Sequence, residues 1–313
     1  MVVQSLIDAL KDEDWEVRKQ VAWALGEMED RKAVKALSEL LLSDESWEVR
    51  REAASALEQI EDRGAVDALS SALTKDLNWE VRREAAEALG RIQDHGAISA
   101  LESALKDENR MVRREVVEAL GELEDHRTID ALIGALKDVD WEIRRKAAWA
   151  LGEIESPNAV EALIAATKDE NPYVRKQAVW ALGNIEDRRA IHALNKSLKD
   201  EFWEVRKYAI DALQDLNDFR AVDALIEILQ NDSHREVRYK AAEALGDIED
   251  RKAVDPLISV LTDPDWQIRK KAARALGEIQ DRRAIQALTK ALKDKNKEVR
   301  SRAAWALGEM KDY

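Results

Sequence analysis

The stretch that decides the fold is Asp12–Asp30, DEDWEVRKQVAWALGEMED, and versions of it recur ten times along the chain. The arginine of its Val-Arg or Ile-Arg pair marks each copy, at a spacing of 31 or 32 residues. These arginines are Arg18, Arg50, Arg82, Arg113, Arg144, Arg175, Arg206, Arg238, Arg269 and Arg300. Repeats of this length stack on their neighbours and form a solenoid. The sequence therefore predicts one array of ten repeats over residues 1–313 rather than two globular domains.

Each repeat is predicted to be a pair of antiparallel helices, because its apolar residues recur at intervals of three and four. In the first repeat Asp14 is a good N-cap for a helix over residues 15–29, here called helix B. The stripe of helix B that should be buried consists of Val17, Val21, Ala24, Leu25 and Met28. Asp30 caps a second helix, helix A, which ends near Ser43. Its inward residues are Ala33, Val34, Leu37 and Leu41.

Three further positions are fixed relative to the repeat arginine. An Ala-Leu pair ends seven residues after it in all ten repeats, and a Gly follows that pair in eight of them. Gly inside a helix costs about 1 kcal/mol relative to Ala, so its recurrence indicates close helix approach or a local bend. An Asp stands six residues before every arginine, at Asp12, Asp44, Asp76, Asp107, Asp138, Asp169, Asp200, Asp232, Asp263 and Asp294. This pair is predicted to form a structural ladder, either within a repeat or across to the next, since active sites are not copied ten times.

The combined pattern, KDxxWEVRxxAAxALGxIxDxxAVxAL, resembles the short bacterial and archaeal HEAT-like repeats of phycobilin lyases. It is also similar to artificial alpha-helical HEAT-like repeat arrays. The resemblance covers the whole chain and implies an all-α fold, a right-handed α-solenoid of about ten helix pairs. It further implies that helix A lies on the convex side, that helix B lines the concave side, and that the Asp and Arg positions above form a ladder. It does not specify a function, because such arrays bind diverse partners.

Composition narrows the classes of partner and chemistry. The formal net charge of −14 and a pI near 5.0 repel nucleic acid and anionic lipid, so nucleic acid is a disfavoured partner. The absence of cysteine excludes disulfides, thiol catalysis and thiolate metal sites. The opening residues, MVVQSLIDALKDED, contain neither a secretory signal nor a membrane span, so we expect no membrane association and a cytoplasmic location.

All ten tryptophans fall on the stripe of helix B opposite the buried one, here called the B-helix stripe. It comprises the positions three before and one, five and nine after the repeat arginine, which are spaced by four. Six tryptophans lie three before the arginine: Trp15, Trp47, Trp79, Trp141, Trp203 and Trp266. Four lie five after it: Trp23, Trp149, Trp180 and Trp305. A cation follows the arginine in eight repeats: Lys19, Arg51, Arg83, Arg114, Arg145, Lys176, Lys207 and Lys270.

We interpret these tryptophans and cations as a binding surface, because Trp and Arg are enriched in binding hot spots. A cation one turn after an early tryptophan can lie across its ring. The alternative is that each Trp only covers the adjoining repeat, with the cation as a solubilising lid.

Catalytic and cofactor motifs are missing from the sequence. None of the four His is followed by Glu, which disfavours the His-Glu di-iron site of HEAT-repeat hydroxylases, and phosphate-binding loops and nucleophile motifs are absent. We therefore expect no enzyme activity, no cofactor and no metal.

The sequence thus predicts a scaffold that binds a protein or an extended peptide. The phycobilin lyase resemblance leaves a bilin lyase-like or chaperone-like chromophore-handling protein as an alternative. Both ends of the chain look cut, so a docking or sensory segment of a larger protein, or an engineered binding array, is a further alternative.

Overall fold

The computed structural model describes residues 2–216 and 219–310, and these residues form helices and turns without any strand. The all-α prediction is therefore confirmed. The chain divides into two compact units, Met1–Ala159 and Val160–Tyr313, which are described separately below as the N-terminal and the C-terminal unit. The prediction of a single array over 1–313 stays a prediction.

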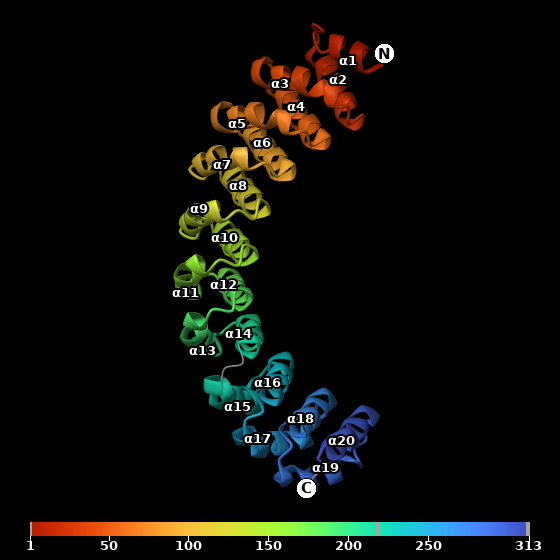
Figure 1. Ribbon diagram of the computed structural model, residues 1–313, viewed down its shortest axis with the longest axis vertical. Coiled ribbons are helices and arrows are strands. Elements are labelled where there is room, and N and C mark those ends of the chain that lie inside the picture. Colours follow the sequence, from red (N-terminus) through yellow and green to blue (C-terminus); the bar gives the residue numbers. More distant parts are fainter. Residues whose placement is uncertain (1, 217–218, 311–313) are drawn as a thin grey trace. The chain divides into compact units, whose positions relative to one another are not determined.

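The N-terminal unit is a stack of helix pairs in two layers (Figure 1). Its A helices are α1 (Val2–Ala9), α3 (Val34–Ser43), α5 (Val66–Lys75), α7 (Ile98–Ala104) and α9 (Ile129–Ala135). Its B helices are α2 (Trp15–Glu27), α4 (Trp47–Ile60), α6 (Trp79–Ile92), α8 (Arg110–Glu122) and α10 (Trp141–Glu153).

The C-terminal unit repeats this arrangement. Its A helices are α11 (Val160–Ala166), α13 (Ile191–Ser197), α15 (Val222–Asn231), α17 (Val254–Ser259) and α19 (Ile285–Ala291). Its B helices are α12 (Pro172–Ile185), α14 (Trp203–Asp215), α16 (Arg235–Ile248), α18 (Trp266–Ile279) and α20 (Lys297–Glu309).

Helix boundaries follow the predicted caps. The Asp14 side chain accepts a hydrogen bond from the Glu16 amide at the start of α2, and the Asp30 side chain accepts one from the Lys32 amide. Asp30 caps a 3-10 turn that precedes helix A, which the sequence did not predict. These 3-10 turns are Arg31–Ala33, Arg63–Ala65, His95–Ala97, His126–Thr128, Pro157–Ala159, Arg188–Ala190, Phe219–Ala221, Arg251–Ala253 and Arg282–Ala284, and a further one, Val260–Thr262, extends α17.

The predicted buried stripe of helix B is confirmed in the inner repeats and partly wrong in the first. In α4, Val49, Ala53 and Leu57 are all fully buried. In α2, by contrast, Val17 is 40% exposed and Met28 is 43% exposed. The reason is positional: this face packs on the preceding B helix elsewhere, and α2 is the first B helix of the chain.

The recurring glycine permits close approach of neighbouring B helices, as predicted. A methyl group at Gly26 would lie only 2.9 Å from the Cα of Ala56 in the next B helix. The approach is equally close at Gly277, where an added methyl group would lie 2.8 Å from the Cα of Ala306 in the next B helix. Neighbouring B helices consequently pack more closely than neighbouring A helices do, and within each unit the B helices lie on the inner side of the bend (Figure 1).

The predicted ladder is present and connects successive repeats. Arg82 Nε lies 2.6 Å from Oδ2 of Asp107 in the next repeat, whereas its Nη1 donates to the backbone oxygen of Asp76 in its own repeat at 2.9 Å. The same pairing joins Arg18 to Asp44, Arg50 to Asp76 and Arg113 to Asp138 in the N-terminal unit. In the C-terminal unit it joins Arg175 to Asp200, Arg206 to Asp232, Arg238 to Asp263 and Arg269 to Asp294. The side-chain hydrogen bond from Arg269 lowers the pKa of Asp294.

Candidate functional site

None of the ten tryptophans is buried, and all ten lie within the described residues. Trp23 is the most exposed of them, at 45%. Five are exposed, namely Trp15, Trp23, Trp79, Trp266 and Trp305. The other five are partly exposed, namely Trp47, Trp141, Trp149, Trp180 and Trp203. The indoles therefore keep contact with solvent on the B-helix surface of each unit.

The later tryptophans also cover the adjoining repeat. The ring atom Cζ3 of Trp149 would lie 3.1 Å from a methyl group at Gly121, and that of Trp305 would lie 2.8 Å from one at Gly277. The glycine of one B helix thus makes room for the indole of the next. Trp203 stacks instead on the His234 ring, with centroids 5.6 Å apart and planes 11° apart. One face of these indoles supports the stack while the rest of the ring stays accessible.

All eight predicted cations of the B-helix stripe are partly exposed. They are Lys19, Arg51, Arg83, Arg114, Arg145, Lys176, Lys207 and Lys270. The expected cation over the preceding indole is found at Trp266, where Lys270 Nζ lies 6.0 Å from the ring centroid. Lys207, by contrast, lies over the ring of Tyr208, 5.7 Å from its centroid.

Several of these cations form a second ladder that the sequence did not predict. Each reaches the Glu that stands two before the arginine of the next repeat: Arg51 to Glu80, Arg114 to Glu142, Lys176 to Glu204 and Lys270 to Glu298. Where the next repeat has Met111 at that position, Arg83 binds Glu84 and Glu87 of its own helix. The glutamates two before the repeat arginine thus neutralise several of the stripe cations.

An acidic cluster on the B helices of the N-terminal unit was also missed. The carboxylates of Glu58, Glu84 and Glu87 each place an oxygen within 4.8 Å of the others. Burial, reinforced by the charges of Glu87 and Glu84, raises the pKa of Glu58 from 4.5 to about 7. Oxygen atoms at such separations could hold a divalent cation. Arg83 and Arg91 already lie against the cluster, however, with Arg91 Nε 3.4 Å from Glu58.

The sequence contained a signal for this cluster. Glu58 occupies the position where eight repeats have Gly, and Glu87 occupies a position where four repeats have Trp. Glu115, in the next B helix, has its pKa raised to about 7 by burial and by the charges of Glu87 and Glu118.

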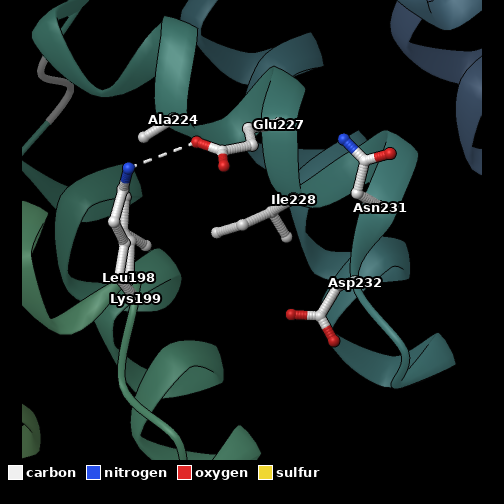
Figure 2. A pocket seen from close by; sticks show the side chains of 7 residues that line it. All are labelled: Leu198, Lys199, Ala224, Glu227, Ile228, Asn231 and Asp232. Atoms are coloured by element: carbon white, nitrogen blue, oxygen red, sulfur yellow. Dashed lines mark ion pairs between the residues drawn. The ribbon is translucent and has the colours of Figure 1, made fainter.

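A crevice between two A helices of the C-terminal unit offers no comparable site. It is a cavity of 270 Å³ between the end of α13 and α15, and Ile228 is one of the side chains that line it (Figure 2). Lys199 and Glu227 pair across it at 3.3 Å, and Asp232 is held by Arg206 in the ladder. Its charged groups Lys199, Glu227 and Asp232 are therefore already paired.

No helix in the described part of the chain is both long and apolar enough to cross a bilayer.

Comparison with known proteins gives the family and several related folds. The sequence model of HEAT repeats matches residues 3–78, 66–140, 129–214, 193–261 and 254–312. No curated protein is significantly similar to the chain.

Among solved structures, an engineered protein from the Northeast Structural Genomics Consortium is 27% identical, with a TM-score of 0.60 over 99% of this chain and 98% of that one. Kap95p, in a structure with RanGDP, is 17% identical with a TM-score of 0.64, and this chain covers 48% of its length. The CpcE–CpcF phycocyanin lyase of Nostoc sp. PCC7120 is 21% identical with a TM-score of 0.45, over 80% of this chain and 94% of that one.

Proposed function

Because the chain belongs to the HEAT repeat family, we propose that it is a non-enzymatic scaffold that binds an extended peptide or protein segment along the B-helix stripe. The observation that carries this proposal is the solvent exposure of every tryptophan on that stripe. Large aromatic side chains that remain accessible beside cations are typical of binding hot spots.

The size of the exposed indole surface favours a partner that crosses several repeats. A tryptophan that is about two-fifths exposed has roughly 80 Å² left to cover, which is worth about 2 kcal/mol at 25 cal/mol/Å² as an upper bound. Association itself costs about 4–15 kcal/mol. Three indoles contribute at most about 6 kcal/mol, which lies within that range and leaves little surplus. An extended partner that also meets the cations therefore fits the surface better than a compact one.

The charged groups support a binding role over catalysis. The ladder acids bind arginine in repeat after repeat, and the stripe cations reach glutamates of the next repeat. These charged pairs connect successive repeats. The indoles are therefore the groups of this surface that are most available to a partner. The acidic balance and the glutamates beside the cations favour a protein partner over nucleic acid.

The test uses peptides selected against the intact chain from a random display library. Replacing Trp15, Trp47 and Trp79 together by Ala should abolish binding of the selected peptides while the helical melting curve stays almost unchanged. The matched control replaces Leu42, Leu77 and Val139 by Ala, which are exposed apolar residues outside the stripe. A large loss of helical stability in the tryptophan variant, or equal loss of binding in both variants, would contradict the proposal.

A further inference from the structure

A second recognition element lies on the B-helix surface of the C-terminal unit. A cavity of 210 Å³ opens between α16, α18 and α20, next to the rings of Tyr239 and Trp266. Four cations line it, namely Lys270, Lys271, Arg274 and Arg302, and no carboxylate does. A hollow with aromatic walls and cationic groups suits an anion that is attached to an apolar stem.

The cations are held in place by aromatic rings and by carboxylates outside the cavity. Lys271 Nζ lies 4.6 Å from the Tyr239 centroid and also bonds to Glu243. Arg274 Nε lies 2.6 Å from Glu278. These contacts fix the walls of the cavity before a ligand arrives, which lowers the ordering cost of binding.

Arg302 differs from the other three cations. Its guanidinium carbon lies 5.0 Å from the centroid of Trp305, and among residues 2–216 and 219–310 no carboxylate forms an ion pair with it. A guanidinium without an acidic partner can bind a carboxylate through two parallel hydrogen bonds. Arg302 is therefore the group in this cavity with capacity for a new anionic ligand.

The repeat position of Arg302 is acidic only in the N-terminal unit and is basic in the last three repeats of the C-terminal unit. Two residues after the repeat arginine, the N-terminal unit has Glu52, Glu84 and Glu115 but also Lys146, whereas the C-terminal unit has Lys240, Lys271 and Arg302. The same surface of helix B is thus acidic on several helices of one unit and basic on several helices of the other.

We propose that the cavity beside Trp266 and Arg302 binds a carboxylate of the partner peptide, with the adjoining apolar residue packed on the Trp266 and Tyr239 rings. This inference rests on the proposed peptide-binding function and names the chemistry recognised by one part of the surface. The carboxylate can come from an acidic side chain or from a chain terminus.

The experiment observes individual tryptophans in the full chain. The protein is labelled with 5-fluorotryptophan, and its fluorine resonances are assigned with Trp266→Phe, Trp305→Phe and Trp180→Phe variants. The probes are N-acetyl-Leu-Glu-Leu amide, the matched peptides with Lys or Gln in place of Glu, and the Gln peptide with a free C-terminus. The two carboxylate-bearing peptides distinguish the side-chain source from the terminal one.

The carboxylate peptides should shift the Trp266 and Trp305 resonances, and Arg302→Glu should weaken that binding on the order of tenfold or more because a charge-assisted contact is lost. The control Lys290→Glu makes the same change of charge at an exposed position of the A helix α19. It should leave binding of the carboxylate peptides unchanged. Equal binding of the Lys peptide, or no effect of Arg302→Glu, would overturn the assignment. Shifts confined to other tryptophans, or no shift with any of these short peptides, would overturn this cavity while leaving the B-helix stripe intact, because the stripe is tested separately by the library-selected peptides and the Trp15, Trp47 and Trp79 variant.

Discussion

Arg82 and Asp107 are joined by two parallel hydrogen bonds, from Nε to Oδ2 at 2.6 Å and from Nη2 to Oδ1 at 3.0 Å, although they belong to different repeats. Arg82 also binds the backbone oxygens of Asp76 and Leu77 at the turn of its own repeat. One side chain therefore fixes the turn of its own repeat and the position of the next. The pair is largely buried, so removing one partner leaves the other charge without compensation.

We predict that Arg82→Ala lowers the free energy of unfolding by about 3 kcal/mol, because it breaks a buried ion pair and removes the arginine donor from Asp107 and from two carbonyls. Urea denaturation followed by circular dichroism measures the change. The control is Arg300→Ala: Arg300 is exposed and, within the described residues, binds only the backbone oxygens of Asp294 and Lys295. Its removal should cost less than about 1 kcal/mol. Equal costs at the two positions would show that the carboxylate contributes nothing.

Glu58→Gln should stabilise the protein at alkaline pH and have little effect at acidic pH. The pKa of Glu58 is raised from 4.5 to about 7 by burial and by Glu87 and Glu84, so the folded state binds a proton more tightly than the unfolded state does. Stability therefore falls as the pH rises from about 4.5 to about 7 and stays reduced above that. At about pH 8 the variant should gain on the order of 1 kcal/mol, since solvent screening reduces the full effect of the shift.

The measurement for Glu58→Gln is urea denaturation at several pH values. Arg83 and Arg91 face the same cluster and remain in the variant. The control is Glu45→Gln, which makes the same substitution at an exposed turn position outside the cluster. If the free energy of unfolding of Glu58→Gln changed with pH as steeply as that of the wild type, Glu58 would not be the group responsible.

Gly277→Ala should destabilise the C-terminal unit even though Ala is the better helix former by about 1 kcal/mol. The added methyl group would lie 2.8 Å from both the Ala306 Cα and the Trp305 ring, so the two helices must separate. Gly134→Ala in α9 is the matched control, because nothing lies within 4 Å of the position its methyl group would take. Thermal melting should therefore move in opposite directions for the two variants.

Glu61→Gly should stabilise the protein by about 1 kcal/mol. Glu61 ends α4 in the left-handed region, with φ at 49°, where a side chain is strained and Gly is not. Its side chain is exposed, so little packing is lost. Glu52→Gly, in the interior of the same helix, should instead lose about 1 kcal/mol. Urea denaturation of both variants provides the comparison, and a loss of stability in Glu61→Gly would contradict the prediction.

The repeat pattern predicted the fold because it constrains the backbone. The caps at Asp14 and Asp30, the core Leu after each Ala and the close approach at Gly26 all follow from helical spacing and side-chain size. The pattern left open whether Arg18 would bind its own Asp12 or the next Asp44, because an Asp in the turn before helix B and an Arg one turn into that helix can meet within a repeat or across to the next. Only the stacking of repeats decides this, in favour of Asp44.

The candidate site was less predictable because long side chains are not fixed by spacing. The position of Arg51 one turn after Trp47 suggested a contact with the indole, but Arg51 forms an ion pair with Glu80 in the next repeat. The cavity beside Arg302 escaped prediction for a similar reason. Its walls come from three repeats, and the sequence does not indicate which cations retain an acidic partner.

The bond between Arg82 and Asp107 has a consequence for how such a chain can change in length. Each joint uses an arginine from one copy and an aspartate from the following copy, so duplicating or deleting a complete copy creates a junction with the same two groups. A cut through the middle of a copy would instead separate an arginine from its aspartate. Duplication or deletion of complete repeats can therefore enlarge or reduce the surface while every junction keeps the same arginine–aspartate pair.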